Sequence, residues 1–301
     1  MNNTITTVIE SLNKFDMPQA YEAVEAAGIS AKKPSIRARV YEAVDKGVLK
    51  KVAKGVYQNN NCLLIQGDGK DLSFLADGSI EAIITDHPYE IKAANNGGDR
   101  HFATYDCFRY TQEDFNEKAR VLKDGCFLVE FLPEESALNY EYLYEIKKMA
   151  EAAGFKYYAK VPWKKGDFIS NCGRKSKNTE DVMIFSKGEP RALRADAKKD
   201  KADPSVKHFM KGCNGMLPTV FDFAKPAKKN MLHQAEKPVE LLEMILEYVT
   251  KENETVLDQF AGSGVLGEAC INKNRKAVLI EIAEEFVEKI KTRLSLTPVV
   301  L

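Results

Sequence analysis

Two short stretches decide the fold, 256-VLDQFAGSGVLG-267 and 84-ITDHPYE-90. In the first, glycines at 262, 264 and 267 form a G-x-G-x-x-G pattern between an apolar strand run and a helical run. Such glycines let the backbone turn tightly and approach a ligand, and Glu281, which ends the next strand run, can bond a ribose hydroxyl. The stretch therefore predicts a nucleotide-type site between a strand and a helix.

The position of this site in the chain argues against a dinucleotide cofactor. A dinucleotide fold needs several more strands after the acidic one, but only twenty residues follow Glu281. The other strands must come from earlier in the chain, which predicts a circularly permuted order. Asp258 would repel a pyrophosphate but suits an ammonium or sulfonium group. A cofactor with an amino acid tail and no phosphates fits better, and a nicotinamide-dependent oxidoreductase stays as the disfavoured alternative.

Outward from these stretches, apolar strand runs alternate with segments of helical spacing. Strands are predicted at 62–68, 80–89, 125–131, 155–163, 181–188, 255–260 and 276–282, and helices at 111–125, 141–154, 236–250, 264–274 and 283–294. Such alternation predicts a parallel sheet wrapped by helices. Residues 188–232 break the rhythm, because they are basic, contain four prolines and show little periodicity. We predict a long functional insertion there.

Residues 1–58 have the pattern of a separate unit. Two segments of helical spacing, a third helix opened by Pro34 and a small hairpin at 48–58 predict a winged helix, with a plain helical cap as the alternative. The formal net charge of the chain is zero, but residues 31–54 hold eight Lys or Arg against two acids. Residues 191–229 hold ten against four. These two basic regions predict contacts with nucleic acid.

The bulk composition is that of an ordinary globular protein. The 301 residues suffice for one large α/β domain and a small accessory domain, and 44% are hydrophobic. We see no apolar run of membrane-spanning length and no signal-peptide pattern, so a cytoplasmic protein without a membrane partner is expected. None of the six cysteines forms a CxxC pair. Free thiols and no metal site are therefore expected.

Three motifs carry a resemblance to a known family. Asp86–Tyr89 resembles the motif Asp-Pro-Pro-Tyr, Phe260–Gly264 matches Phe-x-Gly-x-Gly, and 233-HQAEKPVELL-242 resembles a family element of a His followed by Lys-Pro at the head of a helix. In this order and at these distances, the motifs are similar to those of the beta-class, circularly permuted amino-methyltransferases of DNA, which use S-adenosylmethionine. The resemblance covers about residues 62–292.

The resemblance implies a fold and a set of site residues. It implies a permuted Rossmann-like methyltransferase domain at 59–301, behind the winged-helix-like DNA-binding domain at 1–58, with a variable target-recognition segment at about 188–232. The catalytic residues that it implies are Asp86, His87, Pro88 and Tyr89. The cofactor-binding residues that it implies are Asp68, His233, Lys237, Asp258, Phe260, Ala261, Gly262, Ser263, Gly264, Glu281 and Ile282.

The chemistry of an aromatic amine explains the first motif. The lone pair of the amine is delocalised into the base, so it attacks a methyl group only when two fixed acceptors hold its N–H groups. Asp86 offers one acceptor and the backbone carbonyl of residue 87 the other, Pro88 stiffens the turn, and Tyr89 offers a stacking face for a flipped base. The family usually has proline where this chain has His87. The carbonyl survives that change, so we expect His87→Pro to retain or raise activity.

The resemblance also implies substrate and partners. Methylation of adenine N6 in double-stranded DNA is favoured by the aspartate at the head of the motif; cytosine N4 methylation and a catalytically impaired DNA-binding relative are the alternatives, and an RNA substrate stays open. A homodimer and a companion restriction endonuclease are further expectations. Basic residues in the two basic regions and around Trp163 are assigned to DNA contact, namely Arg37, Arg39, Lys50, Lys51, Lys164, Lys165, Arg174, Lys228 and Lys229.

Overall fold

The computed structural model describes most of the chain. The described residues are 4–12, 14–46, 48–59, 62–89, 107–166, 178–194, 197–226, 231–232, 235–294 and 299–300. Four residues predicted for a site, Arg174, Lys228, Lys229 and His233, lie outside these ranges. Within them, no helix has the length and apolar character needed to cross a membrane.

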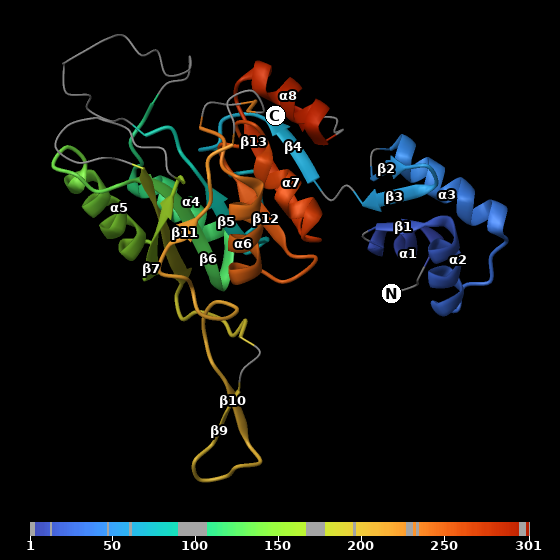
Figure 1. The fold of residues 1–301 in the computed structure, drawn as a ribbon, viewed down its shortest axis with the longest axis horizontal. Helices are drawn as coiled ribbons and strands as arrows, with labels where there is room; N and C mark the ends of the chain where they lie inside the picture. The colour runs from blue at the N-terminus through green and yellow to red at the C-terminus, as the bar shows by residue number, and fades with distance from the viewer. Residues whose placement is uncertain are drawn as a thin grey trace.

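Residues 4–59 form three helices and a small antiparallel sheet, joined to the rest by a single connection (Figure 1). The elements are α1 (Ile5–Ser11), β1 (Lys14–Asp16), α2 (Met17–Ala26), α3 (Lys33–Asp45), β2 (Leu49–Ala53) and β3 (Val56–Asn59), with strand order β1-β3-β2. A capping box begins α2, because Gln19 N donates to Asp16 and Asp16 N donates to Gln19. Apolar side chains from all six elements form a core of their own. The predicted helices and hairpin are present, and β1 is an addition that the sequence did not reveal.

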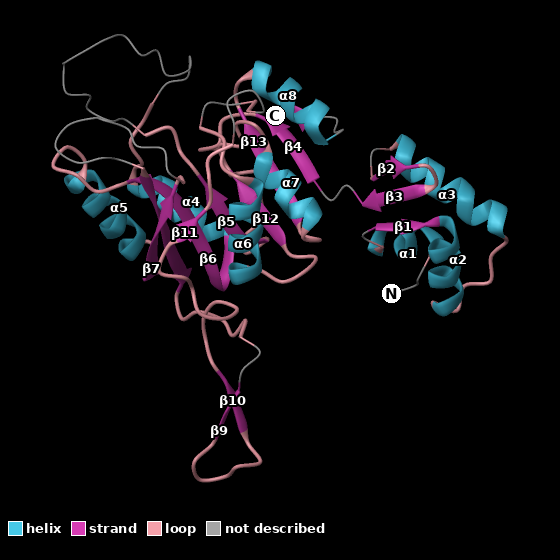
Figure 2. Cartoon of the chain, in the orientation of Figure 1, coloured by secondary structure: helices cyan, strands magenta, loops and turns pink. Residues whose placement is uncertain are grey.

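The large sheet has nine strands in the order β11-β7-β8-β6-β5-β12-β13-β4-β14 (Figure 2). Their bounds are β4 (Cys62–Gln66), β5 (Ile80–Thr85), β6 (Leu122–Pro133), β7 (Phe155–Lys164), β8 (Thr179–Lys187), β11 (Phe221–Asp222), β12 (Thr255–Asp258), β13 (Lys276–Glu281) and β14 (Val299–Val300). The strands from β6 to β14 in this order are parallel, whereas β8 runs antiparallel to both β6 and β7. The expectation of a wholly parallel sheet was therefore wrong: β8 pairs directly with β7, and without a crossover the chain returns in the opposite direction.

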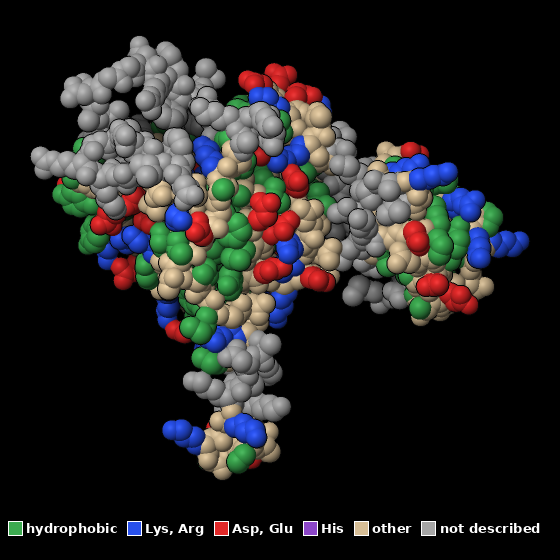
Figure 3. All heavy atoms as spheres, in the orientation of Figure 1, with side chains coloured by type: hydrophobic (Ala, Val, Ile, Leu, Met, Phe, Trp, Pro, Cys, Tyr) green, Lys and Arg blue, Asp and Glu red, His purple; other side chains and the backbone are tan. Residues whose placement is uncertain are grey.

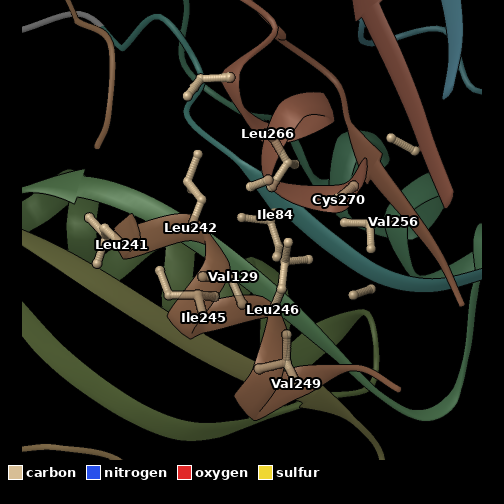
Figure 4. Packing of buried hydrophobic residues seen from close by; sticks show 14 of the residues in the cluster. Ile84, Val129, Leu241, Leu242, Ile245, Leu246, Val249, Val256, Leu266 and Cys270 are labelled. Carbon is tan, nitrogen blue, oxygen red and sulfur yellow. The ribbon is translucent and has the colours of Figure 1, made fainter. Parts of the chain in front are cut away.

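Helices cover both faces of this sheet. Alternate residues of β6 show the division, since Phe127 and Val129 belong to one apolar cluster and Leu128 and Leu132 to the other. The first cluster includes α6 (Val239–Val249), α7 (Val265–Asn272) and α8 (Glu284–Leu294), as Figure 4 shows for α6 and α7. The second includes α4 (Gln112–Val121) and α5 (Tyr140–Ala152). All five helices lie where their apolar spacing predicted them.

The permuted order places a late strand beside an early one. β12 pairs in parallel with β5, with Val256 opposite Ala82 and Leu257 opposite Ile83. The helix α7 that follows β12 packs on one face, and α4, the next helix after β5, packs on the other. In an open α/β sheet, ligands bind at the carboxyl ends of strands where the connections diverge in this way. The sheet therefore positions a site at the ends of β5 and β12.

The basic segment after β8 leaves the sheet at the amino ends of the parallel strands. Arg191 N donates to Gly125 O at 2.9 Å, and the Arg191 guanidinium pairs with Glu254, which immediately precedes β12. Beyond this base, β9 (Ala197–Lys199) and β10 (Lys207–Phe209) form a hairpin that projects far from the body (Figure 1). The hairpin thus starts from the amino ends of β6 and β12, opposite the carboxyl ends where the predicted motifs lie.

Candidate active site

The two quoted stretches meet at the carboxyl ends of neighbouring strands. Asp86 follows β5 directly, and Asp258 is the last residue of β12. Thr85 Oγ1 donates to Asp258 Oδ1 at 3.2 Å, which joins the two strand ends by side chains 173 positions apart in the sequence. Gln259 Nε2 donates to Gly69 O at 2.7 Å and so adds the end of β4. The site is therefore built from segments that only the sheet brings together.

The glycine turn after β12 is tied to the acid at the end of β13. Gly262 N donates to Glu281 Oε2 and Ala283 N donates to Glu281 Oε1, each at 2.8 Å. Gly262 and Gly264 have φ values of 52° and 72°, in the left-handed region that favours glycine. Glu281 is nearly buried, and burial raises the pKa of its carboxyl. The carboxylate keeps lone pairs for a ligand hydroxyl in addition to these two bonds.

The residues around this turn can be compared with a cofactor that has an adenosine part and a positive charge. Ile282, next to Glu281, is 62% exposed, an unusual state for a large aliphatic residue and suited to packing on a ring. At Gly69 a Cβ atom would lie 1.9 Å from Gln259 O, so the backbone here is as close as glycine allows. Burial raises the pKa of Asp258 to about 7, and the charge of this acid suits a cation better than a phosphate. These residues fit such a cofactor.

The remaining residues predicted for the cofactor divide by position. Phe260, Ala261 and Ser263 lie in the same turn, with Ala261 N bonded to Ile280 O at 2.9 Å and the carbonyl of Ser263 accepting from an arginine of α8. Asp68 accepts from Lys70 N at 3.0 Å within an exposed turn. Asp68 therefore has the contacts of a turn residue, and its assignment to the cofactor stays a prediction.

Lys237 lies against the catalytic turn instead of the glycine turn. Its ammonium forms a short ion pair with Asp86 Oδ2 and lies 3.4 Å from Glu180 Oε2, and Glu180 in turn pairs with Lys165. The Lys237 side chain is 8% exposed and that of Asp86 is 27% exposed, so the pair is open on the acid's side. The structure therefore places Lys237 and Lys165 in one series of alternating charges, and their assignments to the cofactor and to DNA stay predictions.

The charged side chains around Asp86 and Lys237 shift the pKa values of these two groups. Burial raises the pKa of Asp86, and the charge of Lys237 opposes that rise. Burial by itself would lower the pKa of Lys237, but the charges of Asp86 and Glu180 outweigh it and raise that pKa. Rings of Phe131 and Trp163 lie 5.0 and 5.8 Å from the ammonium, which favours the cation further. Lys237 is thus the group that holds Asp86 in its ionised form.

His87 turns its side chain away from the site. The imidazole is 1% exposed, and its Nε2 lies 2.8 Å from the hydroxyl of Tyr142, while Nδ1 lies 3.7 Å from Glu130. The ring of Tyr110 packs on it with centroids 4.0 Å apart. Burial lowers the pKa of His87, so the imidazole is neutral at physiological pH. The imidazole is therefore buried behind the catalytic turn.

The rest of the catalytic turn is held by a neighbouring segment. Pro88 O accepts from Phe108 N at 2.9 Å, and Tyr89 forms a parallel bridge with Phe108. Tyr89 is half-buried, with its ring 5.5 Å from that of His87, and the ring of Phe108 lies 5.5 Å from that of Phe260. The two motifs therefore share an aromatic wall.

The residues predicted to contact DNA lie in different places. Arg37 and Arg39 are exposed on α3, and Figure 3 shows Lys and Arg side chains gathered over that end of the N-terminal unit. Lys51 is exposed on β2, which also contains Lys50. Lys164 ends β7 and pairs with the carboxylate of β11 at 3.0 Å. Among the predicted DNA contacts that the structure describes, Lys164 and Lys165 lie near the carboxyl edge of the large sheet.

Sequence reasoning missed several buried charged residues. Glu130 interrupts the apolar run of β6, and Lys118 is fully buried in α4, where it pairs with Glu130. A charge inside an apolar run was the available signal, because a charged residue is rarely buried unless it is paired. The identity of each partner depends on tertiary contacts.

Comparison with known proteins identifies the relatives of this chain. The sequence pattern of the family described as DNA methylase matches residues 80–292. Type II methyltransferase M.HpaI of Haemophilus parainfluenzae is 27% identical over 232 residues, which cover 75% of this chain and 71% of that protein.

Solved structures share the fold. The M1.HpyAVI–SAM complex has a TM-score of 0.52 at 22% identity, covering 77% of this chain and 99% of that chain. A PvuII DNA methyltransferase that is specific for cytosine N4 has a TM-score of 0.52 at 18% identity, covering 77% and 88%. At these identities the likeness shows the arrangement of the sheet and helices alone.

Proposed function

Because the chain belongs to the DNA methylase family, we propose that it methylates the N6 amine of adenine at a specific sequence in DNA. At the level of the family, it is a site-specific DNA methyltransferase of the N6/N4 class that uses S-adenosylmethionine. The observation that carries the proposal is the carboxylate of Asp86, paired with a nearly buried lysine and beside the glycine turn. The choice of adenine rests on aspartate at the head of the motif. Cytosine N4 stays as the second candidate, because a cytosine-N4-specific structure shares the fold.

We assign the cofactor to the glycine turn. With S-adenosylmethionine bound, Glu281 would accept hydrogen bonds from the ribose hydroxyls, Ile282 would pack on the adenine, and Asp258 would face the ammonium or sulfonium group. When bound, S-adenosylmethionine supplies a methyl group on a sulfonium, whose departure as a neutral thioether drives the transfer. The left-handed turn at Gly262 and Gly264 lets the backbone approach this ligand.

The catalytic turn prepares the amine for attack. Lys237 pairs with Asp86 Oδ2, and we assign Oδ1 to accept one N–H of the amine. The carbonyl of residue 87 accepts the other N–H, Pro88 limits the motion of the turn, and Tyr89 stacks on the flipped base. Two fixed acceptors direct the lone pair toward the methyl group, and they need no rearrangement during the reaction. The amine gives up one proton after the transfer, and Asp86, whose pKa burial raises, is the nearest acceptor.

We propose that residues 1–58 are a winged-helix domain that grips DNA phosphates, with residues 59–301 as the methyltransferase domain. The element order, the β1-β3-β2 sheet and the separate core support this interpretation. The exposed guanidinium groups of Arg37 and Arg39 supply the contacts. A homodimer and a companion endonuclease stay predictions.

We propose that the recognition segment is shorter than the predicted range of about 188–232. A base that enters the site lies at the carboxyl edge, whereas the β9–β10 hairpin leaves from the amino edge. From Phe221 the chain runs parallel to β7 and so returns toward the carboxyl edge. We therefore assign base recognition to residues after Phe221 and exclude the hairpin from it.

Nucleoside mass spectrometry of DNA from cells that express the protein tests the function. N6-methyladenine is expected with the wild type and absent with Asp86→Asn, which keeps the shape of the side chain but not its charge. N4-methylcytosine in place of N6-methyladenine would establish the second candidate. Unmethylated DNA with the wild type would refute both.

A further inference from the structure

A buried network lies directly behind the catalytic turn. Tyr110 N donates to the hydroxyl of Tyr142 at 3.0 Å, and that hydroxyl lies 2.8 Å from His87 Nε2. The Tyr110 hydroxyl donates to Glu130 at 3.3 Å, and Glu130 forms a short ion pair with Lys118. The side chains of Glu130 and Lys118 are fully buried. None of these groups faces the proposed ligand, so the reaction described above does not use them.

We propose that His87 is a positioning residue: its imidazole anchors the turn 86–89 from behind and so fixes the carbonyl of residue 87 as the second acceptor of the target amine. This inference rests on the proposed function, since it concerns the same amine. Two separate parts of the fold hold the imidazole, namely α5 through the hydroxyl of Tyr142 and the segment before α4 through the rings of Tyr110 and Phe108.

The network replaces the rigidity that the family obtains from proline. A proline at residue 87 would fix its own φ through the ring, whereas histidine leaves φ free. In this chain the side chain carries the restraint instead, through one hydrogen bond and close ring packing in a fully buried position. A carbonyl that moves by even 1 Å loses its alignment with the amine, and such a displacement costs about 10²-fold in rate.

The same contacts reverse the expectation for His87→Pro. Proline would leave the hydroxyl of Tyr142 without its hydrogen-bond partner at His87 Nε2 and open a gap against the ring of Tyr110, both in a buried place. The carbonyl of Pro88 also accepts from Phe108 N, so a shift of the turn strains a second attachment. We therefore expect His87→Pro to lose activity, opposite to the expectation from the family motif.

Tyr142→Phe removes the hydroxyl that bonds His87 Nε2 without changing the turn 86–89 itself. It removes one hydroxyl that serves both His87 and the Tyr110 backbone, and it keeps the ring. Tyr144→Phe on the same helix is the matched control, because Tyr144 is 60% exposed. His87→Gln and His87→Leu form a second pair, in which only glutamine keeps a polar atom where Nε2 lies.

The experiment measures kcat and KM on DNA, the Kd of S-adenosylmethionine by calorimetry, and the Tm of each variant. Tyr142→Phe removes the buried hydrogen bonds of this hydroxyl to His87 and to Tyr110 N, and it is expected to lower kcat about tenfold or more, with Kd and KM within twofold of wild type. His87→Leu should lose about 10²-fold in kcat, His87→Gln should recover about a tenth of wild-type kcat or more, and Tyr144→Phe should match the wild type.

The outcomes separate this inference from the proposed function. Wild-type kcat in Tyr142→Phe and His87→Leu, or in His87→Pro, would overturn the positioning role. So would a loss that follows Tm alone and vanishes when each variant is assayed well below its own Tm. If the wild type fails to methylate DNA, the proposed function fails instead, and every variant is then equally inactive.

Discussion

Replacing Lys237 with methionine should move the pH dependence of methylation. Lys237 forms an ion pair with Asp86, and the side chain of methionine fills similar space without that charge. The variant leaves Asp86 near Glu180, a second carboxylate that also raises the pKa of Asp86. Because the reaction requires ionised Asp86 as an acceptor, kcat rises with pH through this pKa. Loss of the lysine raises the pKa further, so the acid limb moves to higher pH.

The size of the shift follows from the contact. An opposite charge in direct contact lowers a carboxyl pKa by about 1 to 3 units, and the partial exposure of Asp86 places the expected shift at about 1 to 2 units. Below both pKa values, kcat should therefore fall by about 10- to 100-fold, since one pKa unit is a tenfold change in the ionised fraction. Above both values, the two enzymes should converge.

Single-turnover methylation measured between pH 5.5 and 9.5 at saturating cofactor checks this shift. Lys123→Met is the matched control, because Lys123 pairs with Glu81 at the amino end of the sheet, far from Asp86. Its profile should superimpose on that of the wild type. A Lys237→Met profile with an unmoved acid limb, or an equal loss at every pH, would refute the assignment of Lys237 as the counter-ion of Asp86.

Three further predictions concern the cofactor and DNA. Gly262→Val, at a φ of 52° in the turn bonded to Glu281, should abolish binding of S-adenosylmethionine in calorimetry; unchanged binding would place the cofactor elsewhere. Arg37→Ala with Arg39→Ala should reduce the salt slope of DNA binding by about two units and leave the methylated sequence unchanged, as methylation-site sequencing would show. Replacing residues 197–209 with a short glycine turn should leave the methylated DNA sequence unchanged. Methylation of a different or degenerate DNA sequence would show that the hairpin takes part in recognition.

The position of the elements could be read from the sequence because their signals are local. The continuous apolar run of 277–280 and the helical spacing of 239–249 each report one element's own burial pattern. The glycine turn and the acid of Glu281 also lie on consecutive elements, so their pairing follows from a short connection. The direction of β8 could not be read in this way, because an apolar run has the same pattern in either direction.

The sequence by itself determined the permuted order, the two motifs and the family resemblance, since each depends on residue types in a fixed order along the chain. Only the tertiary structure decided that Lys237 lies on Asp86, 151 positions away, that His87 faces the core, and that the basic hairpin leaves from the amino edge. Contacts of this kind depend on strand register and on the packing of helices against both faces of the sheet. Local periodicity reports neither strand register nor helix packing. A charged or aromatic residue in the sequence therefore indicates that it needs a partner but does not identify that partner.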